Sequence, residues 1–458
     1  MTIRVGSANK TRPCEFLGHP RGLAVLFAAE AWERFSYFGN AALIVLYMVK
    51  YLLQPGRMEA VLGFATIKAM LELLFGELGS QPLASQIFGF YTGLAYSAPI
   101  LGGLLADRLL GQKRVVVIGG VLMAIGHFMM AVEPLFLVAL LMLILGIGAF
   151  KPNVSTQVGA LYSPEDSRRD RAYSIFYLGI NIGAFLAPLV CGALATTYGW
   201  DYGFGAASLG MLLSLGIYLS ASRWLPEDEI RRARPRDRAE PPARTERDAI
   251  RSLIGVCATV SLFWAAFDQQ SNALMLWVED LTDRSVNFGF WQGEIPSPFF
   301  LAINPLFIFI LTPVLVSMWT REGERGSEPS PIRKMAFGCL CLTLANVLMA
   351  GAAWSATGKA SPLWLLGYFG LATLGELHVA PIGLALISRR APAHALSMLM
   401  GVWFAATLPG EILAGFLSGL WSGIEKPKFF LMIGSIAAVT SLVLWLQRSA
   451  FVSSGRHT

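Results

Sequence analysis

The sequence predicts an all-helical membrane protein with twelve transmembrane helices in two halves, and three observations support this. The chain has 458 residues, 55% apolar and only 14% charged, with a mean hydropathy of +0.55, whereas a soluble chain is about a quarter charged. Its apolar residues form runs long enough to cross about 30 Å of hydrocarbon. Its Lys and Arg side chains fall mainly in alternate connections between these runs. Disordered, collagen-like and disulfide-scaffold classes are therefore excluded.

A transmembrane helix needs about 20 mainly apolar residues, and twelve such runs are separated by charged residues, Gly or Pro. The runs are 22–50, 84–106, 114–133, 135–161, 172–196, 203–224, 251–280, 298–320, 333–355, 361–388, 394–422 and 428–448. A further apolar patch, 61–75, lies in the first connection and is short enough to rest on the membrane surface.

A charged, Pro-rich stretch between the sixth and seventh runs divides the chain into two halves. It contains RRARPRDRAEPPARTER and cannot form a packed core, which is typical of a solvated linker. We therefore expect the following organisation. It comprises a cytoplasmic N-terminal segment at 1–21, an N-terminal six-helix bundle at 22–224, a cytoplasmic basic linker at 225–250, a C-terminal six-helix bundle at 251–448 and a cytoplasmic tail at 449–458.

The positions of Lys and Arg predict the orientation. With twelve spans, 27 of the 36 basic residues fall on the side of the amino terminus and seven on the other side. Because cytoplasmic connections carry the excess of Lys and Arg, we expect a multi-pass protein of the cell (inner) membrane with both termini in the cytoplasm. The net charge of +6 then reflects topology, and no nucleic-acid partner is implied.

Cofactor and metal chemistry is not indicated. The five cysteines, Cys14, Cys191, Cys257, Cys339 and Cys341, are an odd set without metal-ligand spacing. The sequence shows no phosphate-binding loop, metal-ligand cluster or Ser, His and Asp arrangement. We expect no cofactor and no enzymatic activity. A membrane-bound enzyme or a non-transporting sensor is the alternative of a different class, and the short connections between spans argue against it.

Seven ionisable side chains lie away from the ends of the expected spans, where each costs about 2.5 to 3.5 kcal/mol. They are Glu30, Glu33, Arg34, Lys151, Asp268, Glu376 and Glu411. The N-terminal half balances two acids with two bases, whereas the C-terminal half has three acids and no base. Full ionisation would bury a net charge of −3, so some of these acids should be protonated or should await a cation.

Spacing places several of these groups on common surfaces. Glu30, Glu33, Arg34 and Tyr37 lie at i, i+3, i+4 and i+7 and therefore share one helical face. Lys151 precedes Pro152, which removes a backbone hydrogen bond and favours a bend beside a cavity. A purely structural pairing of Glu33 with Arg34 stays open, as does a packing role for Glu411.

Several segments resemble a known family. GGLLADRLLGQKR at 102–114 resembles the loop motif between the second and third helices of the major facilitator superfamily. EAWERFSYFG at 30–39, GIGAFKPNVSTQVGALY at 146–162 and FYLGINIGAFLAPLVCGALATTYGWDYGF at 176–204 are similar to signatures of the proton-dependent oligopeptide transporter (POT/PTR) family. FWAAFDQQ at 263–270, INP at 303–305, GELHVAPIG at 375–383 and GVWF at 401–404 resemble its later helices. The resemblance covers nearly the whole chain.

The resemblance implies a major facilitator fold, without the two extra inter-bundle helices of many bacterial members. It implies a proton-coupled symporter that imports di- and tripeptides by alternating access and works as a monomer in the lipid bilayer. The residues it implicates in proton coupling are Glu30, Glu33, Arg34, Lys151 and Asp268. Those implicated in substrate binding are Tyr37, Phe38, Tyr96, Lys151, Asn181, Asn304, Glu376 and Trp403, and those in conformational gating are Asp107, Arg108 and Pro152.

The sequence also departs from the family pattern. Phe38 stands where a second tyrosine is frequent, Ala41 where an arginine is frequent, and Glu411 where asparagine is common. Leu301 and Ala302 replace a frequent polar pair before the Asn-Pro dipeptide. These changes predict a less polar pocket, and they leave open another substrate on the same fold, such as nitrate, an amino-acid derivative or a drug.

Overall fold

The computed structural model describes residues 18–163, 166, 168–227, 244–287, 292–392 and 396–452. Twelve of its helices are long and apolar enough to cross a membrane, as the sequence predicted. Their limits differ from the apolar runs by a few residues, because charged and polar side chains continue several helices beyond the hydrocarbon. Most of the expected N-terminal segment, linker and tail lies outside the described residues.

The first half of the chain forms the helices of one bundle and a short surface helix. They are α1 (Arg21–Tyr47), η1 (Met48–Leu52), η2 (Met58–Ala60), α2 (Phe64–Phe75), α3 (Ser80–Ser97), α4 (Pro99–Leu105), η3 (Ala106–Leu110), α5 (Gln112–Met129), η4 (Glu133–Leu135), α6 (Phe136–Ala160), α7 (Arg168–Tyr198), α8 (Trp200–Ser220) and η5 (Ser222–Trp224). The apolar patch at 61–75 is α2, which is separate from the twelve long helices.

The second half forms the other bundle and a small hairpin. Its elements are α9 (Arg244–Phe267), η6 (Asp268–Ser271), α10 (Ala273–Leu281), β1 (Ser285–Asn287), β2 (Gln292–Glu294), η7 (Ser297–Ala302), α11 (Ile303–Glu324), α12 (Pro331–Ser355), α13 (Leu363–Arg390), α14 (Leu396–Ala405), α15 (Thr407–Gly419), η8 (Leu420–Ser422) and α16 (Lys426–Val452). The hairpin pairs β1 with β2 in antiparallel register, Val286 opposite Gly293.

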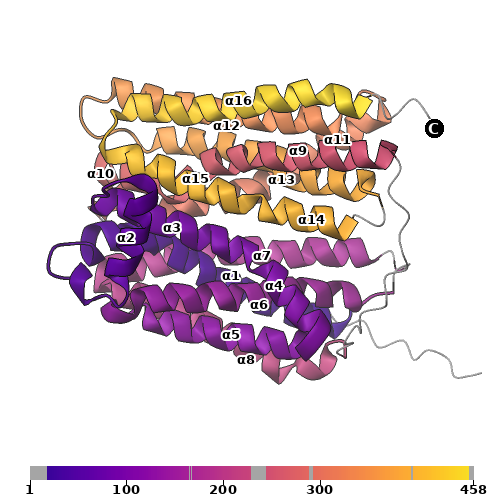
Figure 1. Ribbon diagram of the computed structural model, residues 1–458, viewed down its shortest axis with the longest axis horizontal. Coiled ribbons are helices and arrows are strands. Elements are labelled where there is room, and N and C mark those ends of the chain that lie inside the picture. The colour runs from indigo at the N-terminus through magenta and orange to yellow at the C-terminus, as the bar shows by residue number, and fades with distance from the viewer. Residues whose placement is uncertain are drawn as a thin grey trace, which may run out of the picture.

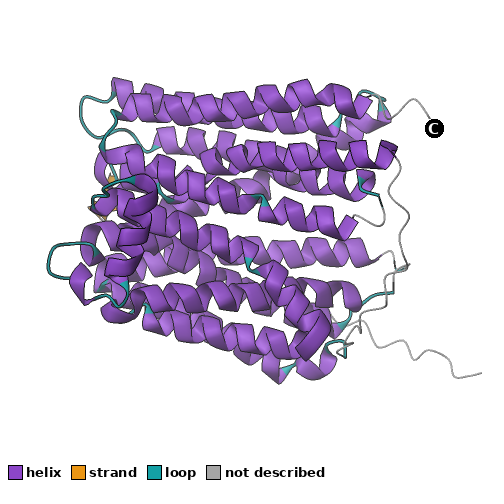
Figure 2. Ribbon diagram, in the orientation of Figure 1, coloured by secondary structure: helices purple, strands orange, loops and turns teal. Residues whose placement is uncertain are grey.

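The helices lie roughly parallel to one long axis, with the first half below and the second half above in Figure 1. The start of α1, the start of α9 and the end of α16 lie at one end of the molecule, here called the termini end (Figure 1). The opposite end, the far end, holds α2, α10 and the short strands (Figures 1 and 2). Gly111 and Gly199 have positive φ values of 82° and 110° and lie between successive helices. A side chain would strain such turns, and glycine permits them.

The two halves contact each other closely near the far end, along α3 and α15, which are adjacent in Figure 1. The Ser85 hydroxyl donates to Asn272 Oδ1 at 2.8 Å, and Gln81 Nε2 donates to the Ser418 carbonyl at 2.9 Å. A Cβ atom on Gly89 would lie 2.6 Å from the Glu411 carbonyl oxygen. The two backbones therefore approach so closely that only glycine fits at this contact.

A second close approach stabilises the N-terminal bundle where α6 contains Pro152. Proline has no N–H, so the carbonyl of Gly148 loses its usual helical partner. Gly102 lies against this carbonyl, and a Cβ at position 102 would come within 1.9 Å of the oxygen. The helix α6 continues through Pro152, and α4 packs directly on the backbone that the proline leaves exposed.

This contact predicts a sharp difference between two neighbouring glycines. Gly102→Ala should destabilise the protein by about 1–3 kcal/mol, since the methyl group overlaps backbone that cannot move away. Gly103→Ala is the matched control, because a Cβ there meets nothing within 4 Å. The midpoint of thermal unfolding of the detergent-solubilised protein measures both effects, and an equal decrease in the two variants would show that Gly102 is not a packing contact.

Candidate functional site

A cavity of about 370 Å³ lies between the two halves. Among the residues that line it are thirteen that the sequence singled out: Arg34, Tyr37, Phe38, Ala41, Tyr96, Lys151, Asn181, Asp268, Leu301, Asn304, Glu376, Trp403 and Glu411. Glu30 and Glu33 lie immediately behind this surface on α1, in contact with Arg34. The structure thus brings together side chains from eight membrane-spanning segments, at positions up to several hundred residues apart in the chain.

The charged motif on α1 forms a buried ion-pair cluster. Arg34 donates from both Nε and Nη2 to the two carboxylate oxygens of Glu33, and its Nε lies 3.4 Å from Glu30 Oε1. The three side chains are at most 3% exposed. A bidentate pair of this kind offsets much of the cost of burying the charges. Glu30 keeps one buried carboxyl oxygen without a hydrogen-bond partner among the described residues.

Lys151, which is on α6, lies near this α1 cluster. Its Nζ is 4.5 Å from the centroid of the Tyr96 ring, and Tyr96 packs edge-on against Tyr37 with ring centroids 6.4 Å apart. The charges of Glu30, Glu33 and Arg34 act on Lys151, although no ion pair joins Lys151 to a described carboxylate at contact distance. The ammonium group therefore faces the cavity with an aromatic ring beside it, available to an anionic ligand.

Glu376 supplies a carboxyl group from the other half. It lies on α13, and Asn304 Nδ2 donates to its Oε2 at 2.9 Å. The same amide lies 2.9 Å from Thr373 Oγ1. Asn304 lies in the first turn of α11, directly after the 3₁₀ helix η7 ends at Ala302. Among the described residues, no Lys or Arg forms an ion pair with Glu376.

Aromatic side chains form much of the remaining surface. Trp403 is only 4% exposed, and its ring packs on α13 where Gly383 leaves room for it, since a Cβ there would lie 1.9 Å from Trp403 Cη2. Asn181 lines the cavity and donates to the Tyr177 carbonyl at 3.0 Å. The expected gating residues lie elsewhere. Asp107 and Arg108 are in η3, and neither they nor Pro152 line the cavity.

The sequence did not reveal every residue of the cavity. Thr92 of α3 and Glu411 of α15 line it, with Thr92 Oγ1 3.0 Å from Glu411 Oε2. Glu411 was noticed as an intramembrane acid, but its neighbour was not, because a threonine in an apolar run carries no distinctive signal. Gln270 and Trp264 also line the cavity. Among the described residues, no group of three or more His, Cys, Asp or Glu side chains could hold a metal ion.

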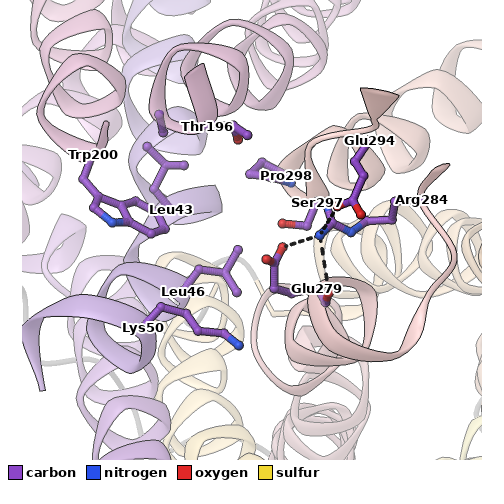
Figure 3. Close-up of a pocket in the computed structure, with 11 residues that line it drawn as sticks. Leu43, Leu46, Lys50, Thr196, Trp200, Glu279, Arg284, Glu294, Ser297 and Pro298 are labelled. Carbon is purple, nitrogen blue, oxygen red and sulfur yellow. Dashed lines mark hydrogen bonds and ion pairs between the residues drawn. The ribbon is translucent and has the colours of Figure 1, made fainter. Parts of the chain in front are cut away.

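A second cavity, of about 430 Å³, lies between the halves at the far end. Figure 3 shows Arg284 between Glu279 and Glu294, to which its Nη2 makes ion pairs of 3.3 Å each, with Lys50 of the other half nearby. Lys50 forms a separate ion pair with Asp280. None of the site residues indicated by the sequence lines this cavity. Its charges are largely neutralised by pairs at the far end, so the central cavity is the better candidate site.

Comparison with known proteins identifies the family. A family model described as the POT family matches residues 113–238 and 242–435, more than half of the chain. The chain belongs to the POT family. It is therefore a multi-pass membrane transporter and not an enzyme, and the prediction of a major facilitator fold with twelve helices is confirmed. Among the described residues, no additional pair of membrane-spanning helices lies between the halves.

The POT relatives match over nearly their whole length. The peptide transporter YePEPT of Yersinia enterocolitica is 33% identical, with 88% of each chain covered. The di-/tripeptide transporter of Lactococcus lactis subsp. lactis is 31% identical, with 95% of this chain and 96% of the relative covered. A crystal structure of a peptide transporter POT in complex with sulfate superposes with a TM-score of 0.83 at 28% identity, covering 95% and 96% of the two chains.

The buried ion pair on α1 predicts a large effect on stability. Glu33→Gln should lower the free energy of unfolding by about 3–5 kcal/mol, because it leaves the Arg34 charge without its bidentate partner. Unfolding in mixed detergent micelles, followed by circular dichroism, measures this change.

The matched control is Glu425→Gln, which breaks the exposed pair between Glu425 and Lys428, both 71% exposed. That pair should contribute less than about 1 kcal/mol. Equal losses in the two variants would mean that the α1 cluster is no more important to the fold than a surface ion pair.

Proposed function

We propose that this protein is a proton-coupled symporter that imports di- and tripeptides by alternating access. The observation that carries the proposal is the placement on one cavity of Lys151 from the N-terminal half and Glu376 from the C-terminal half, oppositely charged groups that form no ion pair among the described residues. A peptide zwitterion presents a carboxylate and an ammonium group, so its two ends complement these side chains. Binding then links the two halves through the substrate.

The surroundings of the two charges support a peptide as the ligand. Asn304 and Asn181 offer amide groups to a peptide backbone near Glu376, and Tyr37, Phe38, Tyr96 and Trp403 form an apolar and aromatic surface for side chains. The Yersinia and Lactococcus relatives are named as peptide transporters. A solved POT structure contains alafosfalin at 30% identity, with a TM-score of 0.81.

The α1 cluster supports coupling to protons. Protonation of Glu33 would break the pair with Arg34, and Glu30 already has an unpartnered carboxyl oxygen. The charges of Glu30, Glu33 and Arg34 also act on Lys151. Protonation of Glu30 or Glu33 would therefore change the electrostatic potential at Lys151, where the peptide carboxylate is expected to bind. An inward potential supplies about 2.3 kcal/mol per proton per 100 mV, enough to accumulate a neutral zwitterion.

The contacts between the halves support alternating access. We propose that the termini end faces the cytoplasm, as the Lys and Arg distribution indicates, and that the far end faces outside. The hydrogen bonds from Ser85 and Gln81 to the other half then close the outer side in this structure. Rocking of the two bundles, 22–224 and 251–448, around the central cavity would alternate its exposure. We propose that Asp107 and Arg108 of η3 and Pro152 of α6 act in this change, as the resemblance to the family implies. A single chain holds the complete site, which supports a monomer.

An amino-acid derivative is the second candidate substrate. A solved POT transporter in complex with 5-aminolevulinic acid is 25% identical, with a TM-score of 0.82. This ligand also carries one amino and one carboxyl group, so it would engage Lys151 and Glu376 in the same way. Competition of dipeptides, 5-aminolevulinic acid and nitrate for uptake distinguishes the candidates, and nitrate, which lacks an ammonium group, should compete least.

Coupled uptake should depend on two charged groups of the N-terminal half, Glu33 and Lys151. Glu33→Gln and Lys151→Ala should abolish uptake of labelled dialanine driven by a pH gradient in proteoliposomes. Glu425→Gln, an exposed acid at the far end, should retain it. Full uptake by either variant of the site, with equal amounts of reconstituted protein, would contradict the mechanism.

Glu376 should recognise the peptide amino terminus. A charged hydrogen bond contributes about 1.5–3 kcal/mol, so the wild-type protein should bind dialanine about tenfold or more tightly than N-acetyl-dialanine. Glu376→Gln should remove most of this preference by weakening dialanine alone. Inhibition constants against a labelled dipeptide measure it, and a preference that survives in Glu376→Gln would place the amino terminus elsewhere.

A further inference from the structure

Two acidic side chains from different helices contact each other at the edge of the central cavity. Asp268 is the first residue of η6, where the seventh membrane-spanning segment changes from α-helix to a 3₁₀ turn, and Glu411 lies on α15. Their carboxyl groups are within hydrogen-bonding contact of one another. Both line the cavity, and Glu411 is only 3% exposed.

A contact between two carboxyl groups requires a proton. An ionised carboxylate is only an acceptor, so a hydrogen bond between two of them exists only when at least one is protonated. Two negative charges side by side in a low-dielectric site repel each other strongly, which favours one shared proton.

No basic side chain replaces that proton. Among the described residues, no Lys or Arg forms an ion pair with Asp268 or Glu411. The titratable groups that face the pair are Tyr37 on α1, Tyr96 on α3, and Tyr368 and Glu376 on α13. Neutral phenols and a further acid cannot compensate two ionised carboxylates. Position 41 on α1, which also lines the cavity, is alanine.

Polar groups around the pair have hydrogen-bonding capacity left. Asp268 Oδ2 is buried without a partner among the described residues, and so is the hydroxyl group of Tyr368, whose side chain is 1% exposed. Such orphaned groups are costly in a core that serves packing alone. Here the unpartnered Asp268 oxygen and Tyr368 hydroxyl can form hydrogen bonds as a proton binds to the acid pair or leaves it.

Glu411 also connects the pair to the opposite half. Thr92 Oγ1 on α3 lies 3.0 Å from Glu411 Oε2 and 2.9 Å from the Phe88 carbonyl. Its single proton can turn from the carbonyl to Glu411 when that carboxyl is ionised. Because Gly89 and Gly415 bring α3 and α15 into backbone contact beside it, a charge on Glu411 acts directly on the far-end closure.

We propose that Asp268 and Glu411 form a two-carboxyl proton site whose shared proton permits closure of the far end. This inference rests on the proposed function as a proton-coupled transporter and assigns a role to Glu411. With the proton bound, the pair is compatible with the close backbone contact between α3 and α15. When the proton leaves, two adjacent charges favour water entry and reopening of the far end. Closure without a proton is thereby disfavoured, which is what coupling requires.

The first test measures proton binding without any substrate. Infrared difference spectra of the purified protein during a pH titration follow the C=O band of protonated carboxyl groups. Loss of the partner carboxyl in Glu411→Gln or Asp268→Asn should weaken proton binding by the remaining acid about tenfold, a shift of about one unit toward lower pH. Glu425→Gln should titrate like the wild type. An identical titration in all four proteins would overturn the shared site.

The second test measures closure of the far end. Ser297 is 3% exposed and lines the far-end cavity, so Ser297→Cys, with Cys14 replaced by Ser, reports opening through labelling by a membrane-impermeant maleimide. The other cysteines are buried. Labelling should rise severalfold as pH increases, and in the Glu411→Gln background this rise should move or vanish. A rise that Glu411→Gln leaves unchanged would show that the pair does not control closure.

Uptake of dialanine separates failure of this inference from failure of the proposed function. If the wild-type protein does not transport dialanine, the proposed peptide transport is wrong, yet the infrared and labelling results still decide the proton site. If the wild type does transport it, the pH for half-maximal uptake should fall by about one unit in Glu411→Gln. An unchanged pH profile in both Glu411→Gln and Asp268→Asn would contradict the inference alone.

Discussion

The cost of burying charge in a membrane interior is the constraint on which the rest of this structure depends. Away from their ends, the expected spans hold five acids and two bases, and the protein accommodates them in three different ways. On α1, Arg34 neutralises Glu33 and approaches Glu30. In the cavity, Lys151 and Glu376 lie on opposite halves without ionic partners among the described residues, ready for a zwitterion. Beside the contact between α3 and α15, Asp268 and Glu411 lie against each other, and among the described residues neither forms an ion pair with a Lys or Arg.

Each of these solutions has a different consequence for conformational change. The α1 cluster lies within one bundle, so its protonation changes the field in the cavity without separating the halves. The proposed substrate site spans both bundles, so a ligand in the cavity would connect them. The acid pair lies where the bundles already touch, beside Gly89 and Gly415. In the proposed mechanism, coupling follows from this arrangement, since proton and peptide would both act on the relative position of the same two bundles.

Sequence reasoning succeeded where the chemistry is local along the chain. The twelve spans followed from apolar runs, and the face formed by Glu30, Glu33 and Arg34 followed from helical spacing. Family resemblance, and not any pattern of spacing, predicted that one cavity holds Tyr37, Tyr96, Asn181, Asn304 and Trp403. The remainder depends on tertiary contacts. Nothing in the sequence indicates that Glu411 meets Asp268, that Thr92 reaches Glu411, or that Gly102 packs on the carbonyl freed by Pro152.

The most direct measurement of the central claim is proton movement driven by peptide alone. Proteoliposomes loaded with a pH-sensitive dye, with equal pH inside and outside and the membrane potential clamped, receive dialanine outside. A proton-coupled symporter carries protons inward with the peptide, so the interior should become acidic, while nitrate or N-acetyl-dialanine should have little effect. Dialanine entry without acidification of the interior would contradict the account.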